Sequence, residues 1–171
     1  MDQFSTETRF AGAGREAASH RFARAAARLP AQAEALVCGP ARHFGDFSDR
    51  GAQQGVYLFS EGEDHLYVGR TSRLHHRLIN HCRGSARSNR SPLKLKVMLA
   101  DAPFAVPVSR RTGWEDIVRD PAFAAAFETA KQRINRMQIR FLAEDDPLSR
   151  YLLEAYCALA LEARYSEVDL G

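Results

Sequence analysis

The sequence predicts an α+β protein with a small three-stranded antiparallel sheet flanked by helices and preceded by an N-terminal helical extension. Residues 56–59 and 65–68 are rich in β-branched and aromatic side chains and are separated by a glycine-bearing turn, which is typical of a β-hairpin. Residues 137–142 alternate between apolar and polar side chains like a third strand. The segments around these strands carry apolar residues at the steps of amphipathic helices.

The composition is that of one globular domain with an appendage. The chain has 171 residues, of which 45% are hydrophobic and 9% are aromatic, and this is enough for a substantial core. We assign residues 1–50 to the helical extension and residues 51–171 to the main domain. The main domain is expected to contain a helical insertion at about residues 92–136.

Cysteine usage and hydropathy bear on the cellular compartment. The three cysteines, Cys38, Cys82 and Cys157, are widely spaced and include no CxxC pair, so they predict neither a disulfide framework nor a structural zinc site. A reducing, cytoplasmic environment fits this pattern. No run of the sequence approaches the ~18 apolar residues of a membrane helix, and we expect no membrane partner.

The N-terminal extension is expected to be helical. Residues 15–37 are rich in alanine, which favours helix, and Pro30 predicts a break or a kink. The glycines and the proline in residues 38–54 predict a connecting loop. We expect the helix to pack on the main domain as an arm. Its weakly apolar side consists of Phe22, Ala25, Leu29 and Leu36.

The hairpin register decides which side chains share a face of the sheet. If Val56 pairs with Val68, the aliphatic side chains of the two strands lie on one face. Strict alternation then places Tyr57 and Tyr67 together on the other face. We therefore expect both phenols to point to one surface of the protein.

The first helix after the hairpin carries two basic side chains on one side. Ser72 is its predicted N-cap, and it is expected to run to about residue 83. Arg77 and His81 are four residues apart and therefore lie on a common face. Apolar residues at four-residue steps predict the buried stripe, which consists of Leu74, Leu78 and Cys82.

Prolines mark the starts of three later helices. Pro92 predicts a short helix through residue 99, and Asp120 followed by Pro121 predicts a longer helix to about residue 136. Pro147 predicts a final helix to about residue 163, with Glu154 in its interior. The apolar stripe of the middle helix consists of Phe123, Phe127, Ala130 and Ile134.

Five of these residues together meet the needs of phosphodiester hydrolysis, which are a base for the attacking water, a cation for the phosphate and help for the leaving oxygen. Tyr57 is the candidate base, provided that a cation, a metal or His81 relieves it of its proton. Arg77 is the candidate phosphate clamp, and Tyr67 would orient the phosphate or the water. Glu154 is the candidate ligand of one Mg²⁺ or Mn²⁺, ions that prefer oxygen donors.

Each candidate also has a structural interpretation when it is taken alone. The tyrosines could be ordinary strand aromatics, and Arg77 and His81 could form a solvated helix face. Glu154 could form a salt bridge with Arg150, one turn earlier on the same helix. Apolar residues on two sides of Glu154 predict a partly buried carboxylate, and such a group needs a partner such as an arginine or a metal.

A basic stretch follows the hairpin. No Asp or Glu occurs from His65 to Ala100, although the net charge of the whole chain is only +3. Such a stretch suits the phosphates of a nucleic acid, and the alternative is a solvated face with acidic neighbours from elsewhere in the fold. The predicted nucleic-acid-binding residues are Arg70, Arg73, Arg83, Arg87, Arg90, Lys94 and Lys96.

The order of these residues resembles the GIY-YIG nuclease superfamily. In that family the second tyrosine is followed ten residues later by an arginine and four residues after that by a histidine, as Tyr67, Arg77 and His81 are here. The local match reads Tyr-Val-Gly-Arg-Thr and then Arg-Leu-x-x-His. The resemblance covers residues 55–83 and extends to residues 137–165. It implies the three-stranded fold and single-metal hydrolysis of nucleic-acid phosphodiesters.

One departure from the family pattern concerns a residue that supports the site. Many members have an asparagine about three turns after the metal-binding glutamate, whereas this chain reads Arg164-Tyr165-Ser166 in the corresponding stretch. Serine is shorter and lacks the amide group, which implies reduced activity or a rearranged support. The branch that the chain most resembles holds restriction-enzyme-like and uncharacterised bacterial members.

The sequence therefore predicts a metal-dependent endonuclease that hydrolyses DNA, with RNA left open as a substrate. A catalytically weakened nucleic-acid-binding module of the same fold is the alternative. A third interpretation is a scaffold protein that dimerises through the alanine-rich arm, and a homodimer is compatible with the nuclease as well. A nuclease predicts that the five candidate residues converge in a cleft, whereas a scaffold has no reason to gather them.

Overall fold

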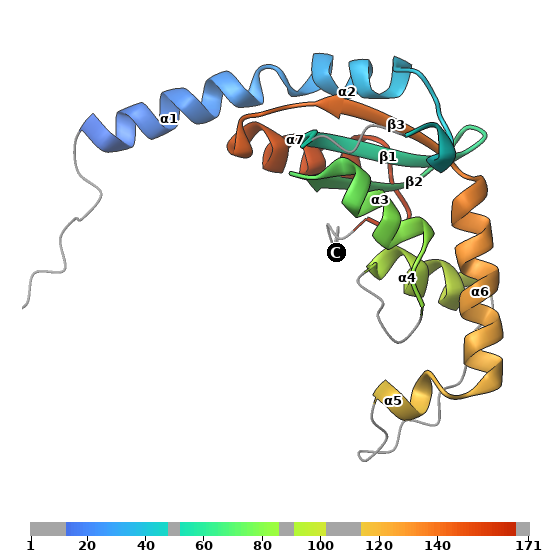
Figure 1. The fold of residues 1–171 in the computed structure, drawn as a ribbon. Coiled ribbons are helices and arrows are strands. Elements are labelled where there is room, and N and C mark those ends of the chain that lie inside the picture. The colour runs from blue at the N-terminus through green and yellow to red at the C-terminus, as the bar shows by residue number, and fades with distance from the viewer. Residues whose placement is uncertain (1–12, 48–51, 86–90, 102–113, 167–171) are drawn as a thin grey trace, which may run out of the picture.

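The computed structural model has the predicted α+β class (Figure 1). It describes residues 13–47, 52–85, 91–101 and 114–166. Strands β1 (Gly55–Glu61), β2 (Asp64–Thr71) and β3 (Gln138–Ala143) form an antiparallel sheet in the order β2-β1-β3. The central strand is therefore β1, and the two edges of the sheet belong to β2 and β3.

The hairpin register differs from the prediction by two residues. Val56 pairs with Arg70 rather than with Val68. A two-residue turn, in which Gly62 has a φ of 59°, shifts the pairing by one residue, and a bulge next to Phe59 shifts it by one more. Because the total shift is even, the face of each side chain is preserved, and both tyrosines still share a face.

Helices cover both faces of the sheet. The face with the tyrosines packs against α3 (Leu74–Cys82), α4 (Pro92–Asp101) and α6 (Pro121–Arg136). The opposite face packs against α2 (Leu29–Cys38) and α7 (Pro147–Ala160). Figure 1 shows the sheet between these two helical layers.

The burial of the two tyrosines corrects the expectation that they point to a surface. Tyr57 is 0% exposed and Tyr67 is 2% exposed, because the helices α3, α4 and α6 lie over them. The prediction that the phenols share one face is confirmed, and that face is a core.

The N-terminal extension forms two helices with different surroundings. The helix is interrupted between α1 (Ala13–Ala26) and α2, and Pro30 lies in the first turn of α2. Ala25, Leu29 and Leu36 are buried as predicted, whereas Phe22 is 53% exposed because α1 projects away from the sheet (Figure 1). The core on the face of the sheet opposite the tyrosines therefore includes α2, and only α1 forms the arm. The predicted loop contains a short 3₁₀ helix, Phe44–Asp46.

The later helices begin where the prolines predict. Asp120 caps α6 by accepting hydrogen bonds from the backbone of Ala122 and Phe123, and the predicted stripe of α6 is buried. Helix α3 differs at its start, because Arg73 rather than Ser72 occupies the cap position. A short helix, α5 (Trp114–Ile117), precedes α6 and was not predicted.

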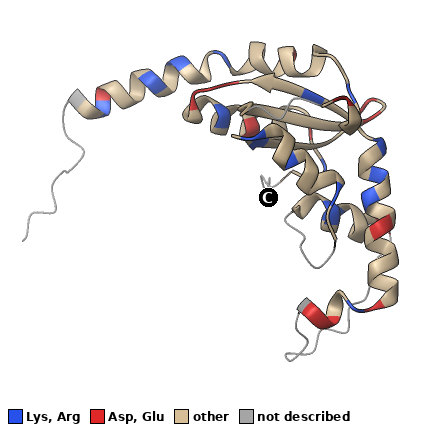
Figure 2. Ribbon diagram, viewed as in Figure 1, with Lys and Arg blue, Asp and Glu red and all other residues tan. Residues whose placement is uncertain are grey.

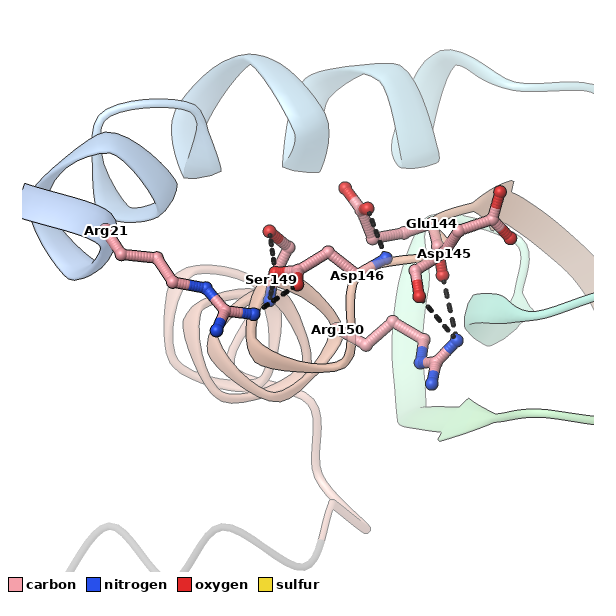
Figure 3. A network of polar contacts seen from close by, with 6 residues as sticks. All are labelled: Arg21, Glu144, Asp145, Asp146, Ser149 and Arg150. Carbon is pink, nitrogen blue, oxygen red and sulfur yellow. Dashed lines mark hydrogen bonds and ion pairs between the residues drawn. The ribbon is translucent and has the colours of Figure 1, made fainter. Parts of the chain in front are cut away.

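The acidic run before α7 joins this helix to the arm (Figure 3). The Asp146 carboxylate accepts a hydrogen bond from the backbone of Ser149 at 2.8 Å and one from Arg21 of α1 at 2.7 Å, and these bonds lower its pKa to about 2. Arg150 donates to the carbonyl of Glu144 at 3.1 Å. Helix α7 ends at residue 160, three residues earlier than predicted.

The segment after α7 covers the outer edge of β2. The backbone N–H of Tyr165 donates to the carbonyl of Leu66 at 2.7 Å, and the Ser166 hydroxyl accepts from the N–H of Val68 at 3.0 Å. Lys96 holds the segment by donating to the carbonyls of both Tyr165 and Ser166. These bonds occupy edge groups that would otherwise be open to strand addition. In the described residues, no helix combines the length and apolar character needed to cross a membrane.

Candidate active site

The hairpin places the two tyrosines side by side over a glycine. Tyr57 on β1 lies opposite Gly69 on β2, and the ring centroids of Tyr57 and Tyr67 are 6.1 Å apart. A Cβ atom at position 69 would lie 2.4 Å from the Tyr57 hydroxyl oxygen and 2.9 Å from the ring of Tyr67. Gly69 is therefore required sterically for the phenol to lie against β2.

Helix α3 supplies two partners for the Tyr57 hydroxyl. The Nε2 atom of His81 is 2.7 Å from the hydroxyl oxygen, and the Nε–H group of Arg77 donates to that oxygen at 3.1 Å. The four-residue spacing of the two side chains brings both to the face of α3 that meets the sheet. The structure thus brings together four of the five predicted site residues, which are Tyr57, Tyr67, Arg77 and His81.

A buried serine orients the imidazole from its other side. The Nδ1 atom of His81 is 2.6 Å from the hydroxyl oxygen of Ser91, which precedes α4 and is 1% exposed. If the Tyr57 hydroxyl donates to Nε2, the single proton of a neutral imidazole lies on Nδ1 and faces Ser91. Sequence reasoning missed this role. A serine before Pro92 is typical of a helix start, and nothing in the sequence places it against His81.

Burial keeps both members of the phenol–imidazole pair neutral. Removal from water, followed by the nearby Tyr67, raises the pKa of Tyr57 well above its ordinary value, although Arg77 acts in the opposite direction. Burial, followed by the positive charges of Arg77 and Lys94, holds the pKa of His81 well below its ordinary value. The imidazole is therefore unprotonated and the phenol is protonated in the resting protein, and burial opposes a proton transfer that would charge both.

Glu154 of α7 contacts β2 at Arg70. Its Oε1 atom accepts a hydrogen bond from the backbone N–H of Arg70 at 3.1 Å, and its Oε2 atom is 2.7 Å from the Nε atom of the same arginine. Arg70 directly follows Gly69, against which the Tyr57 phenol lies. The glutamate and the phenol therefore contact consecutive residues of one strand, and the side chains of consecutive strand residues point to opposite faces of the sheet.

The partner of Glu154 settles one alternative from the sequence. Glu154 pairs with Arg70, while Arg150 donates to the side chain of Gln54 and to the carbonyl of Glu144. The alternative interpretation, a helix salt bridge between Glu154 and Arg150, is therefore not what the structure shows. The expectation that this carboxylate needs a partner is confirmed, and an arginine provides one.

The donor set limits what kind of metal ion the site could hold. Among the described residues, no group of three or more His, Cys, Asp or Glu side chains is arranged to bind a metal. Glu154 is a single carboxylate whose side chain is 24% exposed. This arrangement fits an ion such as Mg²⁺, which keeps several waters and often takes its other ligands from a substrate phosphate. It does not fit an ion that requires a complete protein cage.

The predicted nucleic-acid-binding residues differ in exposure and in their partners; Figure 2 shows how Lys and Arg are distributed along the ribbon. Arg73 and Arg83 are exposed and so remain available for phosphate contacts. Arg70 is engaged with Glu154, and Lys96 with the segment after α7. The prediction that Lys94 contacts phosphates is wrong, because Lys94 is 0% exposed and donates to the carbonyl of Arg83. Two predicted residues, Arg87 and Arg90, lie outside the described residues.

Two cavities lie apart from the candidate site. One of about 600 Å³ is lined by the start of α2 and the end of β3, and one of about 270 Å³ lies at the turn between β1 and β2. Neither is lined by any of the five predicted site residues.

Comparisons with protein-family models, with curated proteins and with solved structures found no match to this chain.

Proposed function

We propose that the protein is a divalent-metal-dependent endonuclease of the GIY-YIG type that hydrolyses DNA phosphodiester bonds. The observation that carries this proposal is the Tyr57 hydroxyl, which has an imidazole at 2.7 Å and a guanidinium at 3.1 Å. A buried phenol that only fills space is satisfied by one hydrogen bond. A phenol that must lose its proton needs an acceptor and a cation, and Tyr57 has both.

The residues of the cluster divide the work of the proposed reaction. His81 takes the phenolic proton at Nε2, and the resulting phenolate takes a proton from the attacking water. In the tautomer whose Nδ1–H donates to Ser91, the Nε2 atom is left open for this proton. Arg77 stabilises the phenolate and presents its planar fork to the phosphate. A divalent ion held by Glu154 would neutralise charge on the scissile phosphate.

A second candidate function, a nucleic-acid-binding module of the same fold, is favoured by two observations. Both phenols are buried, and Oε2 of Glu154 is paired with Arg70. A module that only binds would keep Arg73 and Arg83 at the surface and would have no need to open the tyrosine cluster. The two functions make different predictions for cleavage and the same prediction for binding.

Cleavage of supercoiled plasmid tests the proposal. We expect the wild-type protein to nick the plasmid with Mg²⁺ or Mn²⁺ and to lose this activity in EDTA. Tyr57→Phe and Glu154→Gln should each reduce the rate by roughly 100-fold or more, because they remove the base and the metal carboxylate. A gel-shift assay should show that both variants still bind the plasmid.

Two matched variants control for general effects of the substitutions. Glu63→Gln removes a carboxylate from the exposed hairpin turn, and Tyr156→Phe removes a phenol from α7; both should cleave like the wild type. Full cleavage by Tyr57→Phe or Glu154→Gln would reject the assigned roles. A gel shift without cleavage in any metal would favour the binding module, and the absence of both would reject a nucleic-acid function.

A further inference from the structure

One arginine contacts both oxygens of the candidate metal carboxylate, one through a backbone hydrogen bond and the other through an ion pair. The backbone N–H of Arg70 binds Oε1 of Glu154 at 3.1 Å, and its guanidinium Nε lies 2.7 Å from Oε2. The two contacts differ in how easily they can be broken. The backbone contact is fixed by β2, whereas the guanidinium is at the end of a flexible side chain and can leave Oε2 without disturbing the strand.

A tyrosine on α7 holds the guanidinium in this position. The Arg70 guanidinium carbon lies 3.4 Å from the ring centroid of Tyr151, which is one turn before Glu154 on the same helix. Stacking of a cation on an exposed aromatic ring is a weak interaction. The Arg70 side chain is 35% exposed and Tyr151 is 56% exposed, so the arrangement can open into solvent without unfolding the core.

We propose that Arg70 is an internal cation that occupies Oε2 of Glu154 in the metal-free protein and moves to a DNA phosphate when a divalent ion binds that oxygen. This inference rests on the proposed function. The guanidinium and the ion are both cations and compete for one carboxylate oxygen. The backbone bond to Oε1 keeps Glu154 oriented during the exchange, and the released guanidinium has the planar fork that binds phosphate oxygens.

The exchange couples metal binding to DNA binding. Metal on Glu154 frees Arg70 for the phosphate, and a phosphate that holds Arg70 leaves Glu154 open to metal. Such coupling is reciprocal, so each ligand must raise the affinity for the other. Arg70 is thus a positioning residue with opposite effects on the two ligands: it weakens metal binding to the free protein and strengthens binding of DNA.

This opposition in sign provides the test. We expect Arg70→Gln to bind Mn²⁺ about two- to fivefold more tightly than the wild type in the absence of DNA, because a partly exposed competing ion pair is removed. The same variant should bind plasmid DNA more weakly. Mn²⁺ affinity is measured by calorimetry on the full-length protein, and DNA affinity by gel shift with Mn²⁺ present, in a Tyr57→Phe background that is expected not to cleave the plasmid.

Two further variants separate the local effect from general ones. Arg73→Gln removes the same charge from a nearby exposed position and should leave the Mn²⁺ affinity unchanged. Tyr151→Ala removes the stacking partner and should tighten Mn²⁺ binding by a smaller factor than Arg70→Gln. It also replaces Arg70→Gln as the test should that variant fail to fold.

The outcomes distinguish this inference from the proposed function. Mn²⁺ binding that depends on Glu154 but is equal or weaker in Arg70→Gln would overturn the inference and leave the metal site intact. The inference would also be overturned if Arg73→Gln tightened Mn²⁺ binding as much as Arg70→Gln. Wild-type protein that binds no Mn²⁺, or binds it equally after Glu154→Gln, would overturn the metal site and the inference together.

Discussion

The Tyr57 hydroxyl shows how neighbouring atoms determine what a residue can do. A phenol has a pKa near ~10 in water, and burial raises the pKa of Tyr57 further, so the isolated side chain would be inert as a base. The Nε2 atom of His81 at 2.7 Å offers a place for the proton, and Arg77 offers charge for the phenolate. The chemistry therefore belongs to the three residues as a group.

Gly69→Ala should disrupt this group without removing any of its members. The new methyl group would meet the Tyr57 hydroxyl oxygen at 2.4 Å, and its ring carbon Cζ at 2.5 Å, so the phenol must move away from β2. We expect a loss of about 1 to 3 kcal/mol in the free energy of unfolding, measured with urea, as is usual for an overpacked core. The rate of DNA nicking by this variant should also fall.

Gly45→Ala is the matched control. A Cβ atom at position 45 would meet nothing within 4 Å. We expect the unfolding free energy to change by less than about 0.5 kcal/mol, as for other surface substitutions. Equal free energies of unfolding for the Gly69→Ala and Gly45→Ala proteins would show that the Tyr57 side chain can move aside without loss of stability. Gly69 would then have no steric role.

The site was predictable from the sequence where its parts are close in the chain. Tyr67, Arg77 and His81 belong to one hairpin-to-helix unit, and the spacing of these residues defines their geometry. The pairing of Glu154 with Arg70 and that of His81 with Ser91 were not predictable. Arg70 and Glu154 are 84 residues apart, and the contact between them depends on how α7 docks against the edge of β2.

At the scale of elements, Lys94 joins three helices. It belongs to α4, donates to the carbonyl of Arg83 at the end of α3, and places its ammonium 5.2 Å from the ring centroid of Phe127 on α6. Burial is the main reason that its pKa falls to about 8, with Lys131 contributing. The sequence predicted a phosphate-binding lysine because charge in a sequence does not report burial.

Lys94 should make stability depend on alkaline pH. Between about pH 8 and the ordinary lysine value of 10.5, the unfolded chain holds more protons on this residue than the folded protein does. Raising the pH through this window therefore stabilises the folded state, and the penalty for the buried ammonium is fully present below about pH 8. Across this pH window, we expect the free energy of unfolding of the wild type to rise by on the order of 1 to 3 kcal/mol relative to that of Lys94→Met.

Urea unfolding of both proteins at several pH values across this window measures the difference. Titration of other groups, such as the cysteines, affects both proteins and largely cancels. Parallel stability curves for the wild type and Lys94→Met would mean that the lysine titrates alike in the folded and unfolded chains.

The elements themselves were predicted better than their pairing. Proline and aspartate at helix starts, together with the stripe of α6, defined the later helices because capping and periodicity are local properties. The register of the hairpin was wrong by two residues. The bulge at Leu66 has no distinctive sequence, and a glycine at position 62 fits hairpin turns of more than one length.

At the scale of the whole molecule, the two N-terminal helices belong to different parts of the structure. Leu36 of α2 is fully buried in the core behind the sheet, whereas Ala25 is the buried hydrophobic residue of α1 among those described. The predicted boundary at residue 50 therefore cuts through the core. The boundary that the packing supports lies at residues 27–28, between the two helices.

Truncation tests this boundary. A chain that begins at residue 27 should unfold cooperatively, with a free energy of unfolding within about 2 kcal/mol of the full chain, because α1 contributes only small side chains such as Ala25 to the core and, at the surface, the exposed Arg21–Asp146 pair. Leu36→Ala in the full chain should cost about 2 to 5 kcal/mol. Urea denaturation measures both. A truncated chain that fails to fold would place α1 in the core after all.

The segment after α7, which covers the outer edge of β2, also affects the order in which the protein can fold during translation. Val68 and Ser166, which share a hydrogen bond, are 98 residues apart, so the hairpin leaves the ribosome long before the segment that covers it. Contacts this distant slow folding, and a strand edge that waits uncovered is open to pairing with other chains. Because Glu154 arrives on the same late segment, the nascent protein cannot complete its candidate site until nearly the whole of the described chain has been made.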